Sequence, residues 1–170
     1  MKEDFLHYVW QYKKFDFSNL TTVSGEVLTI TNCGNYLQQT GPDFFNAQIS
    51  IGNQKWAGNI EIHIKSSDWY LHHHEKDANY DNVILHVVWE HDTPVFRKDN
   101  TEIPVLELKK YISKKLGISL DEFEQICAME GKWYTEYPND EKRLNFIYNT
   151  YRKIFKKRNW LVFKLLYRDF

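Results

Sequence analysis

The sequence predicts an α+β protein with an N-terminal helix, a twisted mixed β-sheet of about five to six strands and a helical C-terminal part. Apolar side chains recur at helical spacing in residues 4–14, and strand-like patterns recur between residues 26 and 108. After about residue 109, Lys, Glu, Leu and Ile dominate at helical spacing. Because helices and strands are segregated along the chain, an α+β fold is favoured.

The first strands are recognised by alternating side chains and by the turns between them. Residues 26–31 and 44–51 form two such runs. A third run, residues 56–65, follows a Gly-Asn pair at 52–53, which is typical of a tight turn between antiparallel strands. A hairpin of the second and third runs is therefore expected.

The third run has the clearest strand pattern in the chain. Three isoleucines alternate there with three polar residues, Glu61, His63 and Lys65. Because side chains alternate across a strand, the polar set shares one face. That face is either an exposed polar stripe or a cleft facing Asp43, and both interpretations are open.

The chain after residue 68 predicts further strands around an irregular segment. Residues 69–80 are polar and rich in histidine, which predicts a loop or a short helix. Residues 82–90 are almost continuously apolar, which is typical of a strand covered on both faces. Two more short strands are expected at residues 95–96 and 102–108.

Helical patterns dominate the remainder, with helices expected over residues 119–129 and 138–168. The chain is therefore divided into an α+β core, residues 1–110, and a helical, basic C-terminal extension, residues 111–170, packed on the core or appended to it.

Charge is distributed unevenly. The formal net charge is −1, but residues 1–140 carry 21 acidic and 13 basic side chains, whereas residues 141–170 carry 2 and 9. The basic segment is either a solvated helix face, which can lie against the acidic remainder, or a surface for nucleic-acid phosphates. The residues expected to bind nucleic acid are Arg152, Lys153, Lys156, Lys157 and Arg158.

Composition excludes several protein classes. Cys33 and Cys127 form neither a disulfide framework nor a CxxC metal site, which favours a reducing, cytoplasmic location. No signal peptide is recognised, and no apolar run approaches the roughly 20 residues that span a bilayer. No membrane partner is expected.

Two carboxylates are the first candidates for catalysis. Asp43 follows a Gly-Pro turn, and Glu61 lies within a strand, where Glu is disfavoured. On adjacent strands they could hold Mg²⁺ or Mn²⁺, while His63 or Lys65 orients or deprotonates a water molecule. The alternative for Asp43 is a turn residue that accepts backbone hydrogen bonds.

Histidines provide a second set of candidates, because six of the seven lie between positions 63 and 91. His72, His74 and Asp77 could present two imidazoles and a carboxylate to Zn²⁺ or Mn²⁺; the alternative is a solvated loop. His86 interrupts an apolar strand and is either a hydrogen-bonded core residue, a ligand or a proton carrier.

Several segments indicate a known family. They are Gly41-Pro42-Asp43-Phe44-Phe45-Asn46-Ala47, Trp56-Ala57-Gly58-Asn59-Ile60-Glu61-Ile62-His63, Ser66-Ser67-Asp68-Trp69, His72, Asp77, Tyr80 and Asn82-Val83-Ile84-Leu85-His86-Val87-Val88. Over about residues 3–110 the chain resembles the bacterial family called domain of unknown function 2851. The resemblance implies no activity, and because members are longer, it implies a truncated or diverged member.

A second resemblance concerns a helix and three strands, with Asp43 after Pro42 and Glu61-x-His63 on the third strand. This pattern is similar to the PD-(D/E)XK nuclease superfamily, in which an Asp and a Glu hold Mg²⁺ and a Lys positions or activates the water. Here His63 occupies the Lys position. Lys65, about 7 Å further along the same face, is the other candidate for that role.

The function expected from the sequence is metal-dependent phosphodiester hydrolysis, with Mg²⁺ or Mn²⁺ on Asp43 and Glu61. One alternative is a non-catalytic module that binds nucleic acid or protein. Another is a metallohydrolase with Zn²⁺ on His63, His72, His74 or His86. An inactive, truncated family member is the last alternative.

Overall fold

A computed structural model describes residues 3–37 and 41–116. The helices expected at residues 119–129 and 138–168, and the basic residues expected to bind nucleic acid, lie outside the described residues. Residues 2–115 form one compact unit. No helix within the described ranges is long and apolar enough to cross a membrane.

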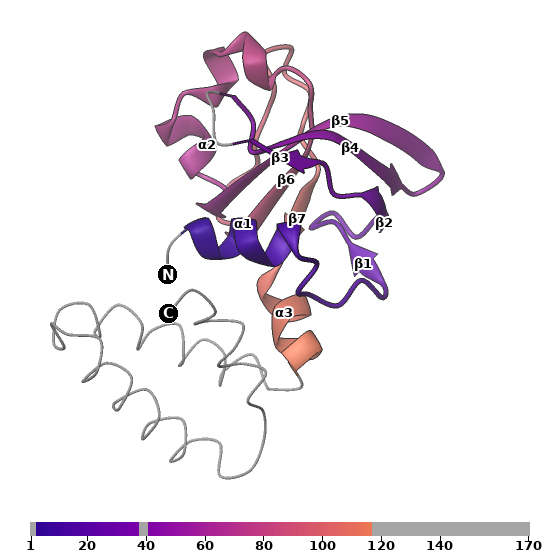
Figure 1. The fold of residues 1–170 in the computed structure, drawn as a ribbon. Helices are drawn as coiled ribbons and strands as arrows, with labels where there is room; N and C mark the ends of the chain where they lie inside the picture. Colours follow the sequence, from indigo (N-terminus) through magenta and orange to yellow (C-terminus); the bar gives the residue numbers. More distant parts are fainter. Residues whose placement is uncertain (1–2, 38–40, 117–170) are drawn as a thin grey trace, which may run out of the picture. The chain divides into compact units, whose positions relative to one another are not determined.

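One mixed, seven-stranded sheet forms the centre of this unit (Figure 1). Its strands are paired in the order β1 (Leu20–Thr21), β2 (Val27–Asn32), β4 (Phe44–Ile51), β5 (Gln54–Lys65), β6 (Val83–Glu90) and β7 (Val105–Glu107), with β3 (Asn35–Tyr36) also on β4. Pairing is antiparallel from β1 to β5 and parallel from β5 to β7. The predicted mixed sheet and the expected hairpin of β4 and β5 are confirmed.

The N-terminal helix α1 (Glu3–Gln11) covers one face of the sheet. Trp10 packs edge-on against Phe44, which is the register partner of Ile60 and therefore shares its face. The indole Nε1 of Trp10 also donates a 2.9 Å hydrogen bond to the carbonyl of Cys33. The isoleucine face of β5 is thus the face beneath α1.

The parallel strands β5 and β6 cannot be joined by a tight turn, so a longer crossover segment connects them. This crossover covers the other face of the sheet. It contains α2 (Asp68–Leu71) and the 3₁₀ turns η1 (His74–Lys76) and η2 (Ala78–Tyr80). Trp69 and Tyr80 anchor it in a small core with Val83, Val88, Val95, Ile103 and Val105. Val88 is the register partner of His63, so this core lies on the face that carries His63.

The parallel pair β5–β6 depends on a close backbone approach at Gly58. A Cβ at this position would lie 2.5 Å from a methyl group of Ile84 and 2.6 Å from the carbonyl oxygen of Asn82. Neither distance is sterically acceptable, so only glycine fits without a shift of β6.

The structure differs from the expected elements in three places. Strands β1 and β3 were missed because two residues cannot show an alternating pattern. The strands expected at 95–96 and 102–108 are reduced to a single bridge, Phe96 with Glu102, and the three-residue β7. A further short helix, α3 (Lys109–Leu116), begins where the composition changes.

Candidate metal centre

Four side chains from β5 and the crossover converge on one point beside the sheet. His63 Nε2 lies 3.1 Å from His72 Nδ1 and 3.5 Å from Glu61 Oε1. His74 Nε2 lies 3.3 Å from the same Glu61 oxygen. One nitrogen from each of His63, His72 and His74 lies within 4.8 Å of the others.

These spacings are those of ligands around a small cation. Donors about 2.0–2.1 Å from a tetrahedral Zn²⁺ are separated from one another by about 3.3–3.4 Å. Three donor–donor distances here, 3.1, 3.3 and 3.5 Å, bracket that value. The three imidazoles therefore form a group that could hold a divalent cation, and Glu61 Oε1 lies beside two of them.

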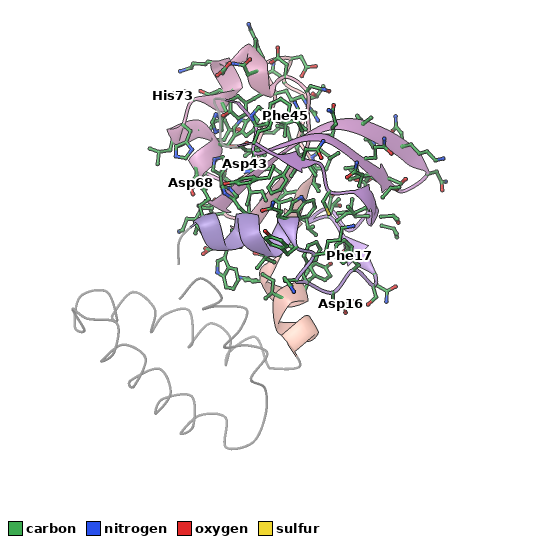
Figure 2. All side chains as sticks on the ribbon, in the orientation of Figure 1. Asp16, Phe17, Asp43, Phe45, Asp68 and His73 are labelled. Carbon is green, nitrogen blue, oxygen red and sulfur yellow. The ribbon has the colours of Figure 1, made fainter. Side chains whose placement is uncertain are left out.

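Local structure explains why the loop histidines point to this site. His72 caps the C-terminus of α2, and His74 begins η1. His73 between them has a left-handed backbone, with φ of 59°. This residue reverses the chain so that its neighbours both reach the cluster, while its own side chain is exposed. Figure 2 shows His73 at the periphery of the crossover.

The crossover leaves β5 through a rigid turn. The Asp92 carboxylate accepts hydrogen bonds from Ser66 Oγ, Ser67 N and Ser67 Oγ at 2.8–2.9 Å. Asp68 Oδ2 accepts a further bond from the backbone N–H of Lys65. These bonds fix the direction in which the histidine-bearing segment leaves the strand.

His86 supports the cluster from β6. Glu61 and His86 are register partners in the parallel pair, so His86 lies diagonal to His63 on the same face. Its Nε2 is 2.8 Å from His63 Nδ1, and the side chain is fully buried. On the other side, the Tyr80 ring stacks on His74 at a centroid distance of 3.7 Å.

Asp43 lies next to Glu61, as expected for carboxylates at neighbouring strands. Its backbone N–H donates to Glu61 Oε2 at 3.1 Å, and its own Oδ2 accepts from the N–H of Ile62 at 2.9 Å. His7 of α1 places Nε2 3.1 Å from the same Asp43 oxygen. In the view of Figure 2, Asp43 lies above α1.

Burial controls the ionisation of the cluster. Burial and repulsion from Asp43 raise the pKa of Glu61 to about 9, against a smaller opposing effect of the Asp43 N–H bond. Burial lowers the pKa of His63 to about 2 and that of His86 to about 3, and it also lowers the pKa of His74. In the metal-free protein, therefore, the contacts of Glu61 with His63 and His74 join neutral groups at pH 7.

His7 differs from the other histidines of the cluster. Burial opposes its charge, but attraction to Asp43, with smaller contributions from Glu3 and Glu61, outweighs burial and raises its pKa. Sequence reasoning missed His7, because a single histidine on an amphipathic helix has no spacing signal that separates it from a packing residue.

The structure thus brings together Asp43, Glu61, His63, His72, His74 and His86. It gives the two other candidates different surroundings. Asp77 is exposed and caps η2 by accepting from the N–H of Asn79, and Lys65 is exposed at the end of β5. The face of β5 that was either an exposed stripe or a cleft is buried at Glu61 and His63.

Comparison with known proteins assigns the chain to a family, but the description of that family names no activity. The model of the family described as "Protein of unknown function (DUF2851)" matches residues 3–160, and the chain belongs to this family. The match continues about 50 residues beyond position 110, where the sequence resemblance was expected to end. No curated protein and no solved structure matches the chain.

Proposed function

We propose that this member of the DUF2851 family is a metal-dependent hydrolase whose cation is bound by His63, His72, His74 and Glu61. One observation carries the proposal: one nitrogen from each of His63, His72 and His74 lies within 4.8 Å of the others, and Glu61 Oε1 lies 3.5 Å from His63 Nε2 and 3.3 Å from His74 Nε2. Burial adds support, because Glu61 and His63 are 5% and 1% exposed. Burial keeps this carboxyl protonated among neutral imidazoles, and a divalent cation there would favour its ionised form.

The donor set favours Zn²⁺ over the Mg²⁺ or Mn²⁺ expected from the sequence. Imidazole nitrogens suit Zn²⁺, whereas Mg²⁺ prefers oxygen ligands and retained water. Asp43 Oδ2 and Glu61 Oε2 are already engaged by backbone N–H groups. Asp43 is therefore assigned the role of holding Glu61 in place rather than that of a primary ligand.

The chain's own residues supply the other requirements of hydrolysis. A bound Zn²⁺ acts as a Lewis acid and lowers the pKa of a water molecule. Because His72 is exposed while the other ligands are buried or nearly so, substrate and water reach the site from the crossover side. His7, paired with Asp43, is the neighbouring group suited to carry a proton near neutral pH.

Phosphodiesters are the substrate class that we propose for this site. The sequence resemblance to the PD-(D/E)XK nucleases supports this class, since Asp43 directly precedes β4 and Glu61-x-His63 lies on β5, although the short strands β1 and β3 also stand between α1 and β4. On a nucleic-acid substrate, phosphate contacts would also come from Arg152, Lys153, Lys156, Lys157 and Arg158.

Metal binding is tested on the full chain by calorimetric titration with Zn²⁺, Mn²⁺ and Mg²⁺. We compare wild type with His72→Asn, which removes an exposed ligand, and with His73→Asn. The latter is a matched control, because Asn tolerates the left-handed backbone of residue 73. Stoichiometric Zn²⁺ binding lost only in His72→Asn supports the proposal. Equal heats in all three proteins, or no Zn²⁺ binding by wild type, contradict it.

Activity is tested with the Zn²⁺-loaded protein on a chromogenic phosphodiester, on single- and double-stranded DNA, and on a carboxylic ester. Glu61→Gln and His72→Asn should lose at least tenfold in rate, whereas His73→Asn should match wild type. Hydrolysis of the carboxylic ester alone would keep the metal site and refute the phosphodiester assignment.

A further inference from the structure

His86 is not one of the four proposed ligands, but it is in hydrogen-bond contact with one of them, His63. Its ring is fully buried in β6, and its Nε2 lies 2.8 Å from His63 Nδ1. Its other nitrogen, Nδ1, is buried with no hydrogen-bond partner among the described residues. A half-satisfied buried imidazole costs stability, and an apolar side chain such as those of its strand neighbours would avoid that cost.

The direction of this hydrogen bond decides whether His63 can bind a cation. A neutral imidazole carries one proton, on either Nδ1 or Nε2. If His86 Nε2 donates to His63 Nδ1, then the proton of His63 is on Nε2, the nitrogen that faces His72 and Glu61. If His63 Nδ1 donates to His86 Nε2, then His63 Nε2 has a free lone pair directed at those residues.

We propose that His86 is a positioning residue of the metal centre, which accepts the Nδ1–H of His63 and thereby holds Nε2 of His63 free for the cation. This inference rests on the proposed metal site. His86 itself is not a ligand, because its Nε2 is occupied by His63 and its Nδ1 faces away from that bond across the ring.

Neighbouring rings keep His86 in this orientation. The Trp69 indole lies with its centroid 5.6 Å from the His86 ring, and the His63 and His86 rings meet nearly at right angles, at 85°. In that geometry the His63 N–H bond can point at the lone pair of His86. Outer hydrogen bonds of this kind orient a metal-bound imidazole and increase its basicity.

Two substitutions separate positioning from packing. His86→Leu fills the space but removes the acceptor, whereas His86→Gln keeps an oxygen that can accept from His63 Nδ1. Val87→Ala controls for destabilisation, because Val87 is buried in the same strand and its side chain points to the opposite face. Each variant of the full chain is titrated with Zn²⁺, and its metal-free thermal midpoint is recorded.

His86→Leu should weaken Zn²⁺ binding by about 10- to 100-fold, the usual effect of losing an outer hydrogen bond. His86→Gln should stay within about threefold of wild type, and Val87→Ala should lower the thermal midpoint without changing the dissociation constant. Wild-type affinity in His86→Leu, or equal weakening in Leu and Gln, overturns the positioning role and leaves the metal site intact. Absence of Zn²⁺ binding by wild type overturns both.

A measurement on wild type keeps the test decisive if His86→Leu does not fold. Long-range ¹H–¹⁵N spectra of the Zn²⁺-loaded protein report which imidazole nitrogen carries each proton. His63 should be protonated at Nδ1 and His86 unprotonated at Nε2. The reverse pattern at His86 Nε2 refutes the proposal.

Discussion

Zn²⁺ binding should release a proton from Glu61 and none from the proposed ligands His63 and His74. Both imidazoles have lowered pKa values and are neutral at pH 7, so they bind a cation without losing a proton. Glu61, whose pKa is raised to about 9 by burial and by Asp43, is protonated there and must lose its proton to coordinate.

The magnitude follows from the difference between pH and pKa. At pH 7 roughly one Glu61 side chain in 100 is ionised, so proton displacement weakens apparent binding by a factor of roughly 100, or about 3 kcal/mol. Apparent Zn²⁺ affinity should therefore rise by nearly tenfold between pH 7 and pH 8. Glu61→Gln has no such proton, and its affinity should change little over the same interval.

Calorimetry in buffers with different ionisation enthalpies measures the number of protons released for each Zn²⁺ bound. Wild type should release about one proton more than Glu61→Gln at pH 7. The difference between the two proteins is the readout, because protons released elsewhere are common to both. Equal release, or a proton taken up by wild type, would refute the assignment of Glu61 as a buried, protonated ligand.

Three further outcomes are expected. In the metal-free protein, His63 and His86 stay neutral in the folded state while the unfolded chain takes up protons. This uptake lowers the free energy of unfolding as pH drops below about 6.5, by at most about 1.4 kcal/mol per pH unit for each imidazole. Glu61 opposes the loss, because it is protonated in the folded state and ionised in the unfolded chain. The test therefore uses Glu61→Gln, and urea titrations of this variant that show no change between pH 7 and pH 5 would contradict the prediction. Gly58→Ala should destabilise the protein by about 1–3 kcal/mol through overpacking against β6, unlike Ala57→Ser at the neighbouring exposed position, as urea unfolding can show. Asp92→Asn should lower stability by roughly 1 kcal/mol at pH 7 through weaker hydrogen bonds to the serine turn. Because its carboxyl has a lowered pKa, this difference should vanish when acid protonates wild type.

The sequence predicts elements well where pattern and turn chemistry agree. The second predicted strand coincides with β4, residues 44–51. The Gly-Pro turn marks its start, and the Gly-Asn pair at 52–53 marks its end. The third begins earlier, at Gln54, because hairpin pairing continues to the register pair Ile51–Gln54. Tertiary pairing adds such residues, and local propensity does not reveal them.

The sequence predicted most residues of the candidate site, but it did not predict how they are arranged in space. Asp43, Glu61 and the clustered histidines are visible as residue types, but their convergence depends on the left-handed residue His73 and on the parallel register of β5 with β6. Neither has a signature in a single sequence. Asp77 shows the converse, because its spacing fits a ligand while its carboxylate instead caps a 3₁₀ turn.

The crossover places the residues of the proposed metal centre close together in the sequence, which affects how the centre can change in evolution. The four proposed donors and His86 all lie within residues 61–86. A single recombination event could transfer this segment, the cassette, as a whole. Length changes in the hairpins before β4 would leave the cassette whole. Deletion of one residue between His63 and His72 would displace half of the donors at once, so relatives that have lost the chemistry should show their gaps there.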